Sequence, residues 1–336
     1  MYYHNMESRD IGVNLATEQY LMNAKNFDEP LLLFYYQDPC IIVGRNQNTL
    51  EEINQDYVTD HHIAVTRRLS GGGAVFDDLG NLSFSFVVDR NDDRFGDFKA
   101  FTAPIVTALK DMGATGVTVS GRNDILVDGK KFSGNAMYVK DDKMFSHGTL
   151  MLDVDQSVVA HALNVPADKM ASKGIKSVRS RVTNLKPYLD SQYQSLTVPE
   201  FRDLLIKKVF GVSDLAAIQD KQYQLTEKDR MAIQDLVDQY YHNWDWVYGK
   251  SPEFTVKRRQ HFPFGTIDAR LLVKNGRLTH VTFFGDFFGE KDANDLAERL
   301  VGTRYEALSL EKVLKTVNVN DYFSGMDQAR LVQFLL

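Results

Sequence analysis

The sequence predicts an α+β fold with a large mixed-sheet domain followed by a small C-terminal α+β domain. Runs that favour strands dominate the first half and do not alternate strictly with helical segments, which argues against a doubly wound parallel sheet. A breaker-rich segment at 243–254 (NWDWVYGKSPEF) divides the chain. The 336 residues are enough for about two domains.

The first half begins with an expected amphipathic helix over 11–27 (IGVNLATEQYLMNAKNF). Two β-rich runs follow at 31–36 and 40–45, and the Gln-Asp-Pro between them predicts a hairpin. Further strands are expected at 63–67, 82–88, 116–120, 124–128, 131–139 and 144–153. Further helices are expected at 98–112, 155–163, 197–210 and 226–242.

The breaker-rich segment predicts a linker at 247–252 between a catalytic domain, 1–246, and an accessory domain, 253–336. In the latter, two strands are expected to meet across Asn275-Gly276, a strong hairpin signal. Helices expected at 289–300, 308–316 and 325–334 would cover that small sheet.

The composition argues against several functional classes. With 39 basic and 45 acidic residues the net charge is −6, which gives no sign of a nucleic-acid partner. No apolar run approaches the roughly 20 residues of a membrane span, and the N-terminus lacks the pattern of a signal peptide. The single cysteine, Cys40, cannot form an internal disulfide. We therefore expect a cytoplasmic protein that does not bind membranes.

The most unusual segment is Arg67-Arg68-Leu69-Ser70-Gly71-Gly72-Gly73-Ala74-Val75. Three glycines without Cβ atoms allow positive φ and close approach to a ligand. Successive amides can form an anion-binding nest, and the arginines can bind phosphate or carboxylate oxygens. The alternative is a flexible turn between strands. The flanking arginines and Asn81 favour anion binding.

Other known phosphate and metal motifs are missing from the sequence. The one Gly-Lys-Ser, 249–251, is preceded by Trp244 where a Walker A loop requires glycine, and we interpret it as linker. No dinucleotide glycine fingerprint occurs. The His61-His62 pair lacks ligand spacing, so we assign no metal site.

A second segment begins with Asn123 and Asp124 and continues to Lys131 after a turn. A lysine held on a strand beside an arginine-lined loop suits developing charge on a phosphate or acyl oxygen. A single lysine is usually just solvated, but the small residues of Ser133–Ala136 leave room for a ligand. His147 follows; a lone histidine is more often structural than catalytic.

A third segment carries four bases and no acid within nine residues, in an otherwise acidic protein. These bases are Lys173, Lys176, Arg179 and Arg181. A solvated loop and an anion-binding loop remain equally good interpretations.

Together these segments resemble the lipoate–protein ligase A family in its two-domain bacterial form. The motifs RR-x-SGGGAV-x-x-DLGN, GRND, K-x-SG-x-A, HGTL and KGI-x-SVRSRV-x-NL occur in this order between Cys40 and Leu185. The resemblance implies a mixed-sheet catalytic domain of the biotin/lipoate ligase type.

The resemblance also implies the reaction. Lipoate would attack the α-phosphate of ATP, with Mg2+ present, to give lipoyl-AMP and pyrophosphate. A lysine of a lipoyl domain would then take the acyl group and release AMP. Implied partners are the lipoyl domains of 2-oxoacid dehydrogenase complexes and the glycine-cleavage H protein.

Site residues follow from the same resemblance. Lys131 matches the essential lysine that holds the lipoate carboxylate and the α-phosphate together. The implied ATP site comprises Arg68, Gly73, Ala74, Val75, Phe76, Asn123, Asp124 and Lys131. The implied lipoate site comprises Ser70, Gly71, Gly72, Lys131, Ala136 and His147. Lys173, Lys176, Arg179 and Arg181 match a loop that closes over the adenylate.

One position departs from the family, which commonly has histidine where this chain has Asp77. This extra carboxylate could bind magnesium or repel phosphate, and it is the one feature that favours a non-catalytic lipoate-binding module. An acyltransferase of the same fold would need a nucleophilic cysteine after the lysine motif, but only Cys40 is present, in an apolar strand. A biotin ligase is a further rival, against which the KGI-x-SVRSRV segment and the C-terminal domain favour lipoate.

Overall fold

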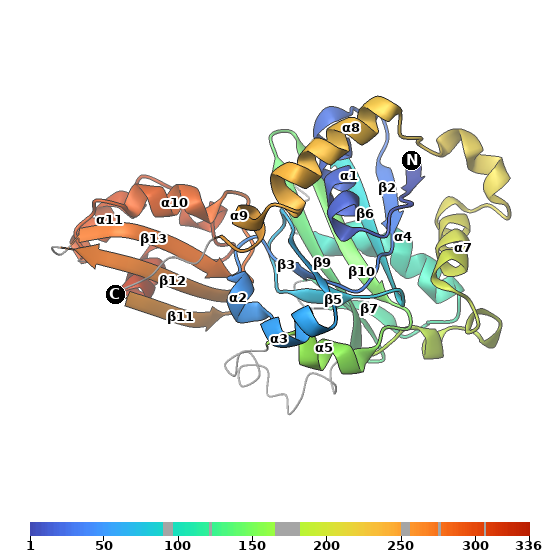
Figure 1. The fold of residues 1–336 in the computed structure, drawn as a ribbon, viewed down its shortest axis with the longest axis horizontal. Helices are drawn as coiled ribbons and strands as arrows, with labels where there is room; N and C mark the ends of the chain where they lie inside the picture. The colour runs from blue at the N-terminus through green and yellow to red at the C-terminus, as the bar shows by residue number, and fades with distance from the viewer. Residues whose placement is uncertain (90–96, 121–122, 165–181, 250–255, 275–276, 306) are drawn as a thin grey trace.

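The computed structural model describes residues 1–89, 97–120, 123–164, 182–249, 256–274, 277–305 and 307–336 (Figure 1). The larger part of the molecule is built on a seven-stranded sheet, and the smaller, C-terminal part on a three-stranded sheet. The two parts lie side by side along the long axis. The α+β class expected from the sequence is confirmed.

The seven-stranded sheet positions most of the candidate site. Its order is β1-β2-β6-β10-β9-β8-β7, and only the β1–β2 pair is parallel. Its strands are β1 (Tyr2–Asn5), β2 (Leu31–Tyr35), β6 (Asn81–Asp89), β7 (Val117–Ser120), β8 (Asp124–Val127), β9 (Lys130–Lys140) and β10 (Lys143–Met151). Except for β1, these strands were expected from the sequence.

A second sheet in the larger part has the order β4-β3-β5. It consists of β3 (Cys40–Val43), β4 (Ala64–Arg67) and β5 (Val75–Asp77). The hairpin predicted from 31–36 and 40–45 is therefore wrong, because β2 pairs with β1 and β6 while β3 pairs with β4 and β5. Every residue of β2 and β3 is buried, so each strand needs cover on both faces. A surface hairpin would leave one face of each strand in water.

Helices cover both faces of the seven-stranded sheet (Figure 1). On one face, Leu32 and Phe34 of β2 join a cluster with α4 (Phe98–Asp111) and α7 (Val198–Phe210). On the other, Leu31 and Leu33 join a cluster with α1 (Ile11–Ala24) and α8 (Glu227–Leu236). The shorter helices include α2 (Thr49–Glu52), α3 (Gln55–Asp60), α5 (Gln156–Ala162) and α9 (Trp244–Val247). The candidate site lies on the α1 face.

The C-terminal part is a three-stranded antiparallel sheet covered by helices, with its own apolar core. Its strands are β11 (Val256–Phe262), β12 (Gly265–Lys274) and β13 (Arg277–Gly285), and its helices are α10 (Ala293–Leu300), α11 (Ala307–Leu314) and α12 (Gln328–Leu335). Lys274 pairs with Arg277, so β12 and β13 pair as the Asn-Gly signal predicts. Strand β11 was not expected from the sequence.

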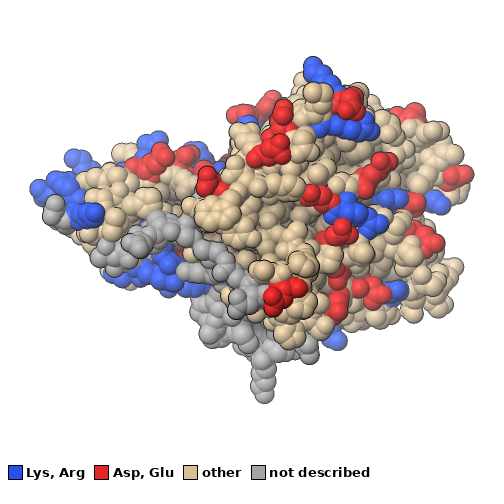
Figure 2. Space-filling model, viewed as in Figure 1, with Lys and Arg blue, Asp and Glu red and all other residues tan. Residues whose placement is uncertain are grey.

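The surface agrees with the modest negative charge of the chain. On the face shown in Figure 2, acidic and basic side chains are interspersed over the larger part, without an extended field of one sign. Among the described residues, no helix is long and apolar enough to cross a membrane.

Candidate active site

The glycine loop 70–73 follows two arginines that are buried. Arg67, at the end of β4, is 1% exposed. It donates to Thr49 Oγ1 and to the carbonyl oxygens of Gly44, Arg45, Gln47, Trp246 and Val247. Burial, and then the neighbouring Arg68, lowers the pKa of Arg67 to about 10, so the side chain stays charged at neutral pH. Its donors are directed to the protein's own backbone, and Arg67 joins the end of β3 to α9.

Arg68 shapes the glycine loop from inside. Its guanidinium donates to the carbonyl oxygens of Ile42, Gly71 and Gly73 and to Ser70 Oγ. With these carbonyls held by the arginine, the amides of residues 71–74 donate no hydrogen bond within the described part of the chain. A row of amides without acceptors is what the anion-binding nest predicted from the sequence would require.

Glycine is required where the loop crosses the end of β3. A Cβ on Gly44 would lie 1.9 Å from the carbonyl oxygen of Gly72, well inside van der Waals contact. Gly72 itself has φ +97°, a conformation that side chains with a Cβ rarely adopt. The loop therefore depends on the absence of side chains at both positions.

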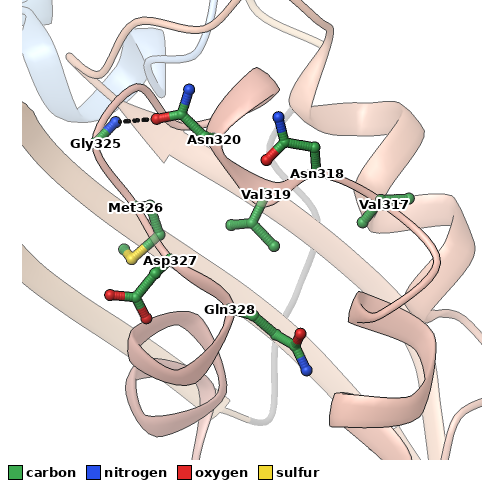
Figure 3. A pocket seen from close by; sticks show the side chains of 8 residues that line it. All are labelled: Val317, Asn318, Val319, Asn320, Gly325, Met326, Asp327 and Gln328. Atoms are coloured by element: carbon green, nitrogen blue, oxygen red, sulfur yellow. Dashed lines mark hydrogen bonds between the residues drawn. The ribbon is translucent and has the colours of Figure 1, made fainter.

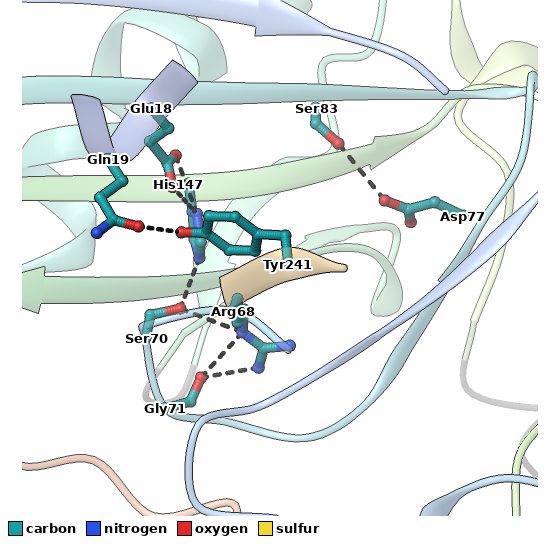
Figure 4. A network of polar contacts seen from close by, with 9 residues as sticks. All are labelled: Glu18, Gln19, Arg68, Ser70, Gly71, Asp77, Ser83, His147 and Tyr241. Atoms are coloured by element: carbon teal, nitrogen blue, oxygen red, sulfur yellow. Dashed lines mark hydrogen bonds and ion pairs between the residues drawn. The ribbon is translucent and has the colours of Figure 1, made fainter. Parts of the chain in front are cut away.

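A buried polar network fastens the loop to the large sheet (Figure 4). Ser70 Oγ lies 2.7 Å from His147 Nε2 on β10, and His147 Nδ1 lies 3.1 Å from both carboxylate oxygens of Glu18 on α1. A carboxylate can only accept, so His147 donates from Nδ1, and in the neutral imidazole Nε2 then accepts the Ser70 hydroxyl proton. All three side chains are buried. His147 thus has the carboxylate partner that the sequence could not assign.

Lys131 lies on β9, with Nζ 2.7 Å from Asp124 Oδ1 on β8. Its side chain is 28% exposed, so the ammonium is held but accessible. A Cβ on Gly134 would lie 3.1 Å from Nζ, and glycine at this position leaves the ammonium room. Ala136 lies two residues beyond Gly134 along β9, a span of roughly 7 Å, and directly opposite His147. Strand β9 therefore runs from the Lys131 ammonium to the position opposite His147.

Buried polar atoms without partners mark the sheet surface beside this network. Ser85 lies opposite His147 in the β6–β10 register, and its Oγ has no hydrogen-bond partner among the residues that the structure describes. The same is true of Asn81 Oδ1 and Gln37 Oε1. Buried polar groups are rarely left unpaired, so such a group indicates a place where a ligand or water would complete the hydrogen bonds.

Asp77 lies at the end of β5 and is 2% exposed. Its Oδ2 accepts from Gln37 Nε2 at 2.8 Å and from Ser83 Oγ at 3.5 Å. Burial, and then the nearby Asp78, raises the pKa of Asp77 to about 7, although Arg68 and the two hydrogen bonds oppose this. Near neutral pH this carboxyl group is therefore only partly ionised, and it would repel phosphate less than a full negative charge.

The remaining predicted site residues fall into three groups. Asn123 Nδ2 donates to the carbonyl oxygen of Asn135, and Asn135 returns a bond to Asn123, so this pair closes the end of β8 onto β9. Val75 and Phe76 form β5 next to the glycine loop. The loop bases Lys173, Lys176, Arg179 and Arg181 lie outside the described residues.

The C-terminal domain contacts both the loop after β3 and the glycine loop. The amide of Gly285 donates to the carbonyl oxygen of Asn46, and Asp292 forms an ion pair with Arg45. The ring of Phe288 is buried edge-on against Phe98, with centroids 6.0 Å apart, and a Cβ on Gly72 would lie 3.4 Å from it. The segment after β13 therefore forms one wall beside the glycine loop.

Three members of the candidate site were not expected from the sequence. Glu18 falls on the apolar stripe of α1 that includes Leu15 and Met22. A carboxylate within such a stripe is the sequence feature that could have identified Glu18 as a buried polar residue. Gln37 carried no signal, since it lies in a connection after β2. Tyr241 bonds to Gln19, next to Glu18, from a part of the chain 222 residues away.

Cys40 is fully buried in β3, paired with Asp77 across the β3–β5 ladder. Burial raises the pKa of its thiol well above the ordinary value. A neutral, buried thiol is a poor nucleophile. This supports a structural interpretation of Cys40 and disfavours the cysteine-dependent acyltransferase.

A hollow in the C-terminal domain has a volume of about 470 Å³ (Figure 3). Its lining consists of Val317–Asn320 and Gly325–Gln328. The single carboxylate there, Asp327, caps the first turn of α12, and Asn320 bonds the amide of Gly325. The hollow contains none of the predicted site residues and no cation, so it does not compete as the anion site.

A mixed sheet that carries an accessible lysine ammonium on β9, and a glycine loop held to the neighbouring β10 through Ser70 and His147, is the arrangement expected of an acyl-activating ligase. Residues 10–210 match the model of the lipoyl protein ligase A/B catalytic domain, and residues 251–335 match the bacterial lipoate protein ligase C-terminus. The chain belongs to the lipoate–protein ligase family.

Relatives along the whole chain agree with this assignment. The chain is 44% identical over 326 residues to lipoate-protein ligase LplJ of Bacillus subtilis (strain 168), covering 97% of both chains. It is 41% identical over 331 residues to lipoate–protein ligase 1 of Staphylococcus aureus (strain Mu50), covering 98% of both. The named relatives favour lipoate over biotin as the acyl substrate class of this family.

Solved structures have the same fold. P. falciparum LipL1, crystallised in complex with lipoate, has a TM-score of 0.73 at 24% identity, covering 94% of each chain. A bipartite lipoate protein ligase of Thermoplasma acidophilum has a TM-score of 0.62 at 26% identity, covering 76% of this chain and 98% of that one. A lipoate-protein ligase A bound with ATP has a TM-score of 0.59 at 24% identity.

Proposed function

We propose that this ligase joins lipoate to ATP, forming lipoyl-AMP and pyrophosphate, and then transfers the lipoyl group to a lysine of a lipoyl domain. The observation that carries the proposal is the accessible Lys131 ammonium on the strand that leads to the Ser70–His147 network. Both ends of a mixed anhydride would find partners there. Relatives named for lipoate, and similar folds solved with lipoate or ATP, support the substrates.

The nucleotide would lie over the glycine loop. Unpaired amides at 71–74 suit the α-phosphate, and the backbone of Gly73, Ala74, Val75 and Phe76 would line the rest of the nucleotide site. Arg68 would contribute by holding the loop carbonyls away from the phosphates, because its donors already bind those carbonyls. Asn123 and Asp124 would border the site from β8.

Lys131 would bring two anions together. The lipoate carboxylate and the α-phosphate repel each other, and one ammonium between them offsets that repulsion while holding the attacking oxygen near phosphorus. Asp124 fixes the ammonium before substrates arrive, so little reorganisation is needed. The new bond joins the carboxylate oxygen to phosphorus, and pyrophosphate leaves with the electrons of the broken bond.

The acyl chain would extend along β9 from Lys131 towards His147. Gly134 and Ala136 are small enough to let it pass. Ser70, Gly71 and Gly72 would form the opposite side, and the apolar cluster that includes Leu33 would receive the tail. The unpaired Ser85 hydroxyl, opposite His147, suits a polar group or water beside the ligand.

Mg2+ fits this site only with help from the substrate. Among the described residues, no group of three His, Cys, Asp or Glu side chains could hold a metal ion. An ion that takes most of its ligands from phosphate oxygens and water needs few protein carboxylates. It would neutralise charge on the pyrophosphate leaving group, with Asp124 as the carboxylate nearest to Lys131.

In the second step the acceptor lysine amine attacks the acyl carbonyl, a C–N bond forms, and AMP leaves. The acceptors would be lipoyl domains of 2-oxoacid dehydrogenase complexes and the glycine-cleavage H protein, in the cytoplasm. Support comes from the T. acidophilum ligase, which was studied with its E2 lipoyl domain. Residues 1–246 would catalyse both steps, 247–252 would link the domains, and Lys173, Lys176, Arg179 and Arg181 would close over the adenylate.

Lipoate-dependent exchange of labelled pyrophosphate into ATP tests the first step. We expect exchange with lipoate and none without it. A protein that only binds lipoate, or that transfers an acyl group from a thioester, would show no exchange under either condition. That result would reject the proposed adenylation.

A further inference from the structure

Tyr241 lies in a part of the chain that neither matched family model covers, between residues 210 and 251. It ends a π-helical turn, Val237–Tyr241, that continues α8. The amide of His242 donates to the carbonyl oxygen of Val237 at 2.9 Å, five residues back. Such turns are rare and frequently occur at functional sites.

The π turn determines where Tyr241 points. Asp229, Ile233, Val237 and Tyr241 are all buried and spaced by four residues. In a regular α-helix each such step rotates the side chain by about 40°, so three steps would turn Tyr241 by about 120° away from the face that Asp229 occupies. A π turn rotates less per residue, which returns Tyr241 to the buried face.

Tyr241 is held from two sides. Its hydroxyl donates to Gln19 Oε1 at 2.8 Å, on α1, and its carbonyl oxygen accepts from Thr66 Oγ1 at 2.9 Å, on β4. Gln19 is next to Glu18, which binds His147. Tyr241 is therefore fixed between α1, which carries Glu18, and β4, which leads into the loop that carries Ser70 (Figure 4).

The Tyr241 ring packs in an apolar cluster. The ring is 2% exposed and belongs to the cluster that contains Leu33 and Tyr35 of β2, Leu69 before the glycine loop and Phe145 before His147. This is the cluster that would receive the acyl tail. A large, doubly tethered ring there is suited to end the site.

We propose that Tyr241 closes the far end of the acyl site and sets the length of acyl chain that the enzyme activates. This inference rests on the proposed function, because it assumes that the acyl chain runs from Lys131 past His147. Replacing the ring with a smaller side chain removes volume at that end. An unbranched chain longer than eight carbons would then fit.

The test compares acyl-dependent ATP–pyrophosphate exchange with lipoate, octanoate and dodecanoate. In Tyr241→Leu we expect the kcat/KM ratio of dodecanoate to octanoate to rise at least tenfold, mostly through KM, since a hydrophobic pocket distinguishes a single methylene by about 10-fold or more. Tyr241→Phe keeps the ring volume, so its ratio should stay within about twofold of the unaltered enzyme. Tyr241→Met gives the same readout as Tyr241→Leu if the leucine variant does not fold, judged by circular dichroism.

Tyr240→Leu is the matched control. Tyr240 belongs to the same π turn and its ring lies 6.3 Å from the Tyr241 ring, but it is only partly buried and packs edge-on against Trp246, at 5.3 Å. Its substitution should leave the ratio unchanged. If a folded Tyr241→Leu or Tyr241→Met variant keeps the original dodecanoate-to-octanoate ratio, Tyr241 is only structural and the inference is wrong. This holds whether or not the activity with octanoate falls. Absence of lipoate-dependent exchange in the unaltered enzyme would instead reject the proposed function.

Discussion

Ser70 Oγ and His147 Nε2 lie 2.7 Å apart across 77 residues of sequence, and this contact ties the glycine loop to β10. Glu18 binds the other ring nitrogen, which fixes the tautomer of the imidazole. Arg68 donates to the same serine oxygen. The loop, the sheet and α1 are therefore positioned by a single network, and a change in one of them is transmitted to the others.

Lys131→Ala should reduce lipoate-dependent ATP–pyrophosphate exchange by at least about 100-fold, because it removes the charge that holds both anions. Lys131→Arg should restore little activity, since a planar guanidinium cannot replace a compact ammonium between two oxygens. Both variants should keep the thermal midpoint within a few degrees, because the side chain is partly exposed. Lys130→Ala is the control: this neighbouring lysine is exposed, and its loss should leave exchange unchanged. Near-normal exchange in Lys131→Ala would remove Lys131 from the site.

Gly44→Ala should damage both stability and activity. The new methyl group would meet the Gly72 carbonyl oxygen at 1.9 Å, so the glycine loop must shift. We expect a loss of about 1–3 kcal/mol in the free energy of unfolding and a drop in exchange of at least tenfold. Gly302→Ala is the control, since a Cβ there meets nothing within 4 Å and only the positive φ of +85° is strained. It should cost about 1–2 kcal/mol and leave activity intact. Equal activity in the two variants would mean that the loop tolerates movement.

Asp77→Asn should stabilise the protein at pH 8 and flatten its dependence on pH. The pKa of Asp77 is about 7 in the folded protein against 3.8 as the ordinary value, so between about pH 4 and 7 the folded state holds a proton that the unfolded state has released. Stability is therefore lost as the pH rises through this window and is constant above it. The full effect is at most about 4 kcal/mol. An amide stays neutral and can donate to Gln37 Oε1, which has no partner in the described part of the chain.

Urea unfolding at a series of pH values measures this effect. Asp141→Asn, at an exposed position, should follow the unaltered protein at every pH. A steady difference between Asp77→Asn and the unaltered protein from pH 4 to 8 would show that Asp77 does not titrate in this range.

Local patterns predicted most of the fold. Strands β4 and β6 to β10 and the longer helices lie where β-rich runs and helical periodicity predicted them. The hairpin prediction for β2 and β3 was wrong because the periodicity of a strand buried on both faces does not reveal its partner. Short β5 gave no periodic signal, since its three residues are stabilised by pairing with β3.

The parts of the candidate site that lie in short motifs, such as the triple glycine and the arginine pair, could be predicted from the sequence. The triple glycine indicated a nest, and the structure shows unpaired amides there. The arginine pair indicated anion binding, yet Arg67 and Arg68 bind mainly backbone carbonyls. The sequence does not distinguish an arginine that binds an external anion from one that binds the carbonyl oxygens of its own loop, because both place a guanidinium beside the glycine loop. Glu18 and Tyr241 contribute through tertiary contacts with no fixed spacing.

Arg67→Lys should destabilise the catalytic domain and loosen α9 from it. Lysine cannot reproduce the planar fork that bonds the carbonyl oxygens of Gln47 and Val247, and leaves several buried acceptors unpaired at about 1–3 kcal/mol each. We expect a loss of at least about 3 kcal/mol by urea unfolding, with faster amide hydrogen exchange at Val247 and Tyr248, whose amides bond within α9. The control is Arg277→Lys, because this exposed arginine bonds one carbonyl, and its loss should cost under about 0.5 kcal/mol. If exchange in α9 were unchanged in Arg67→Lys, the helix would be held by Thr49 and the Trp246 indole, which also bond across this junction, and Arg67 would serve the loop after β3 alone.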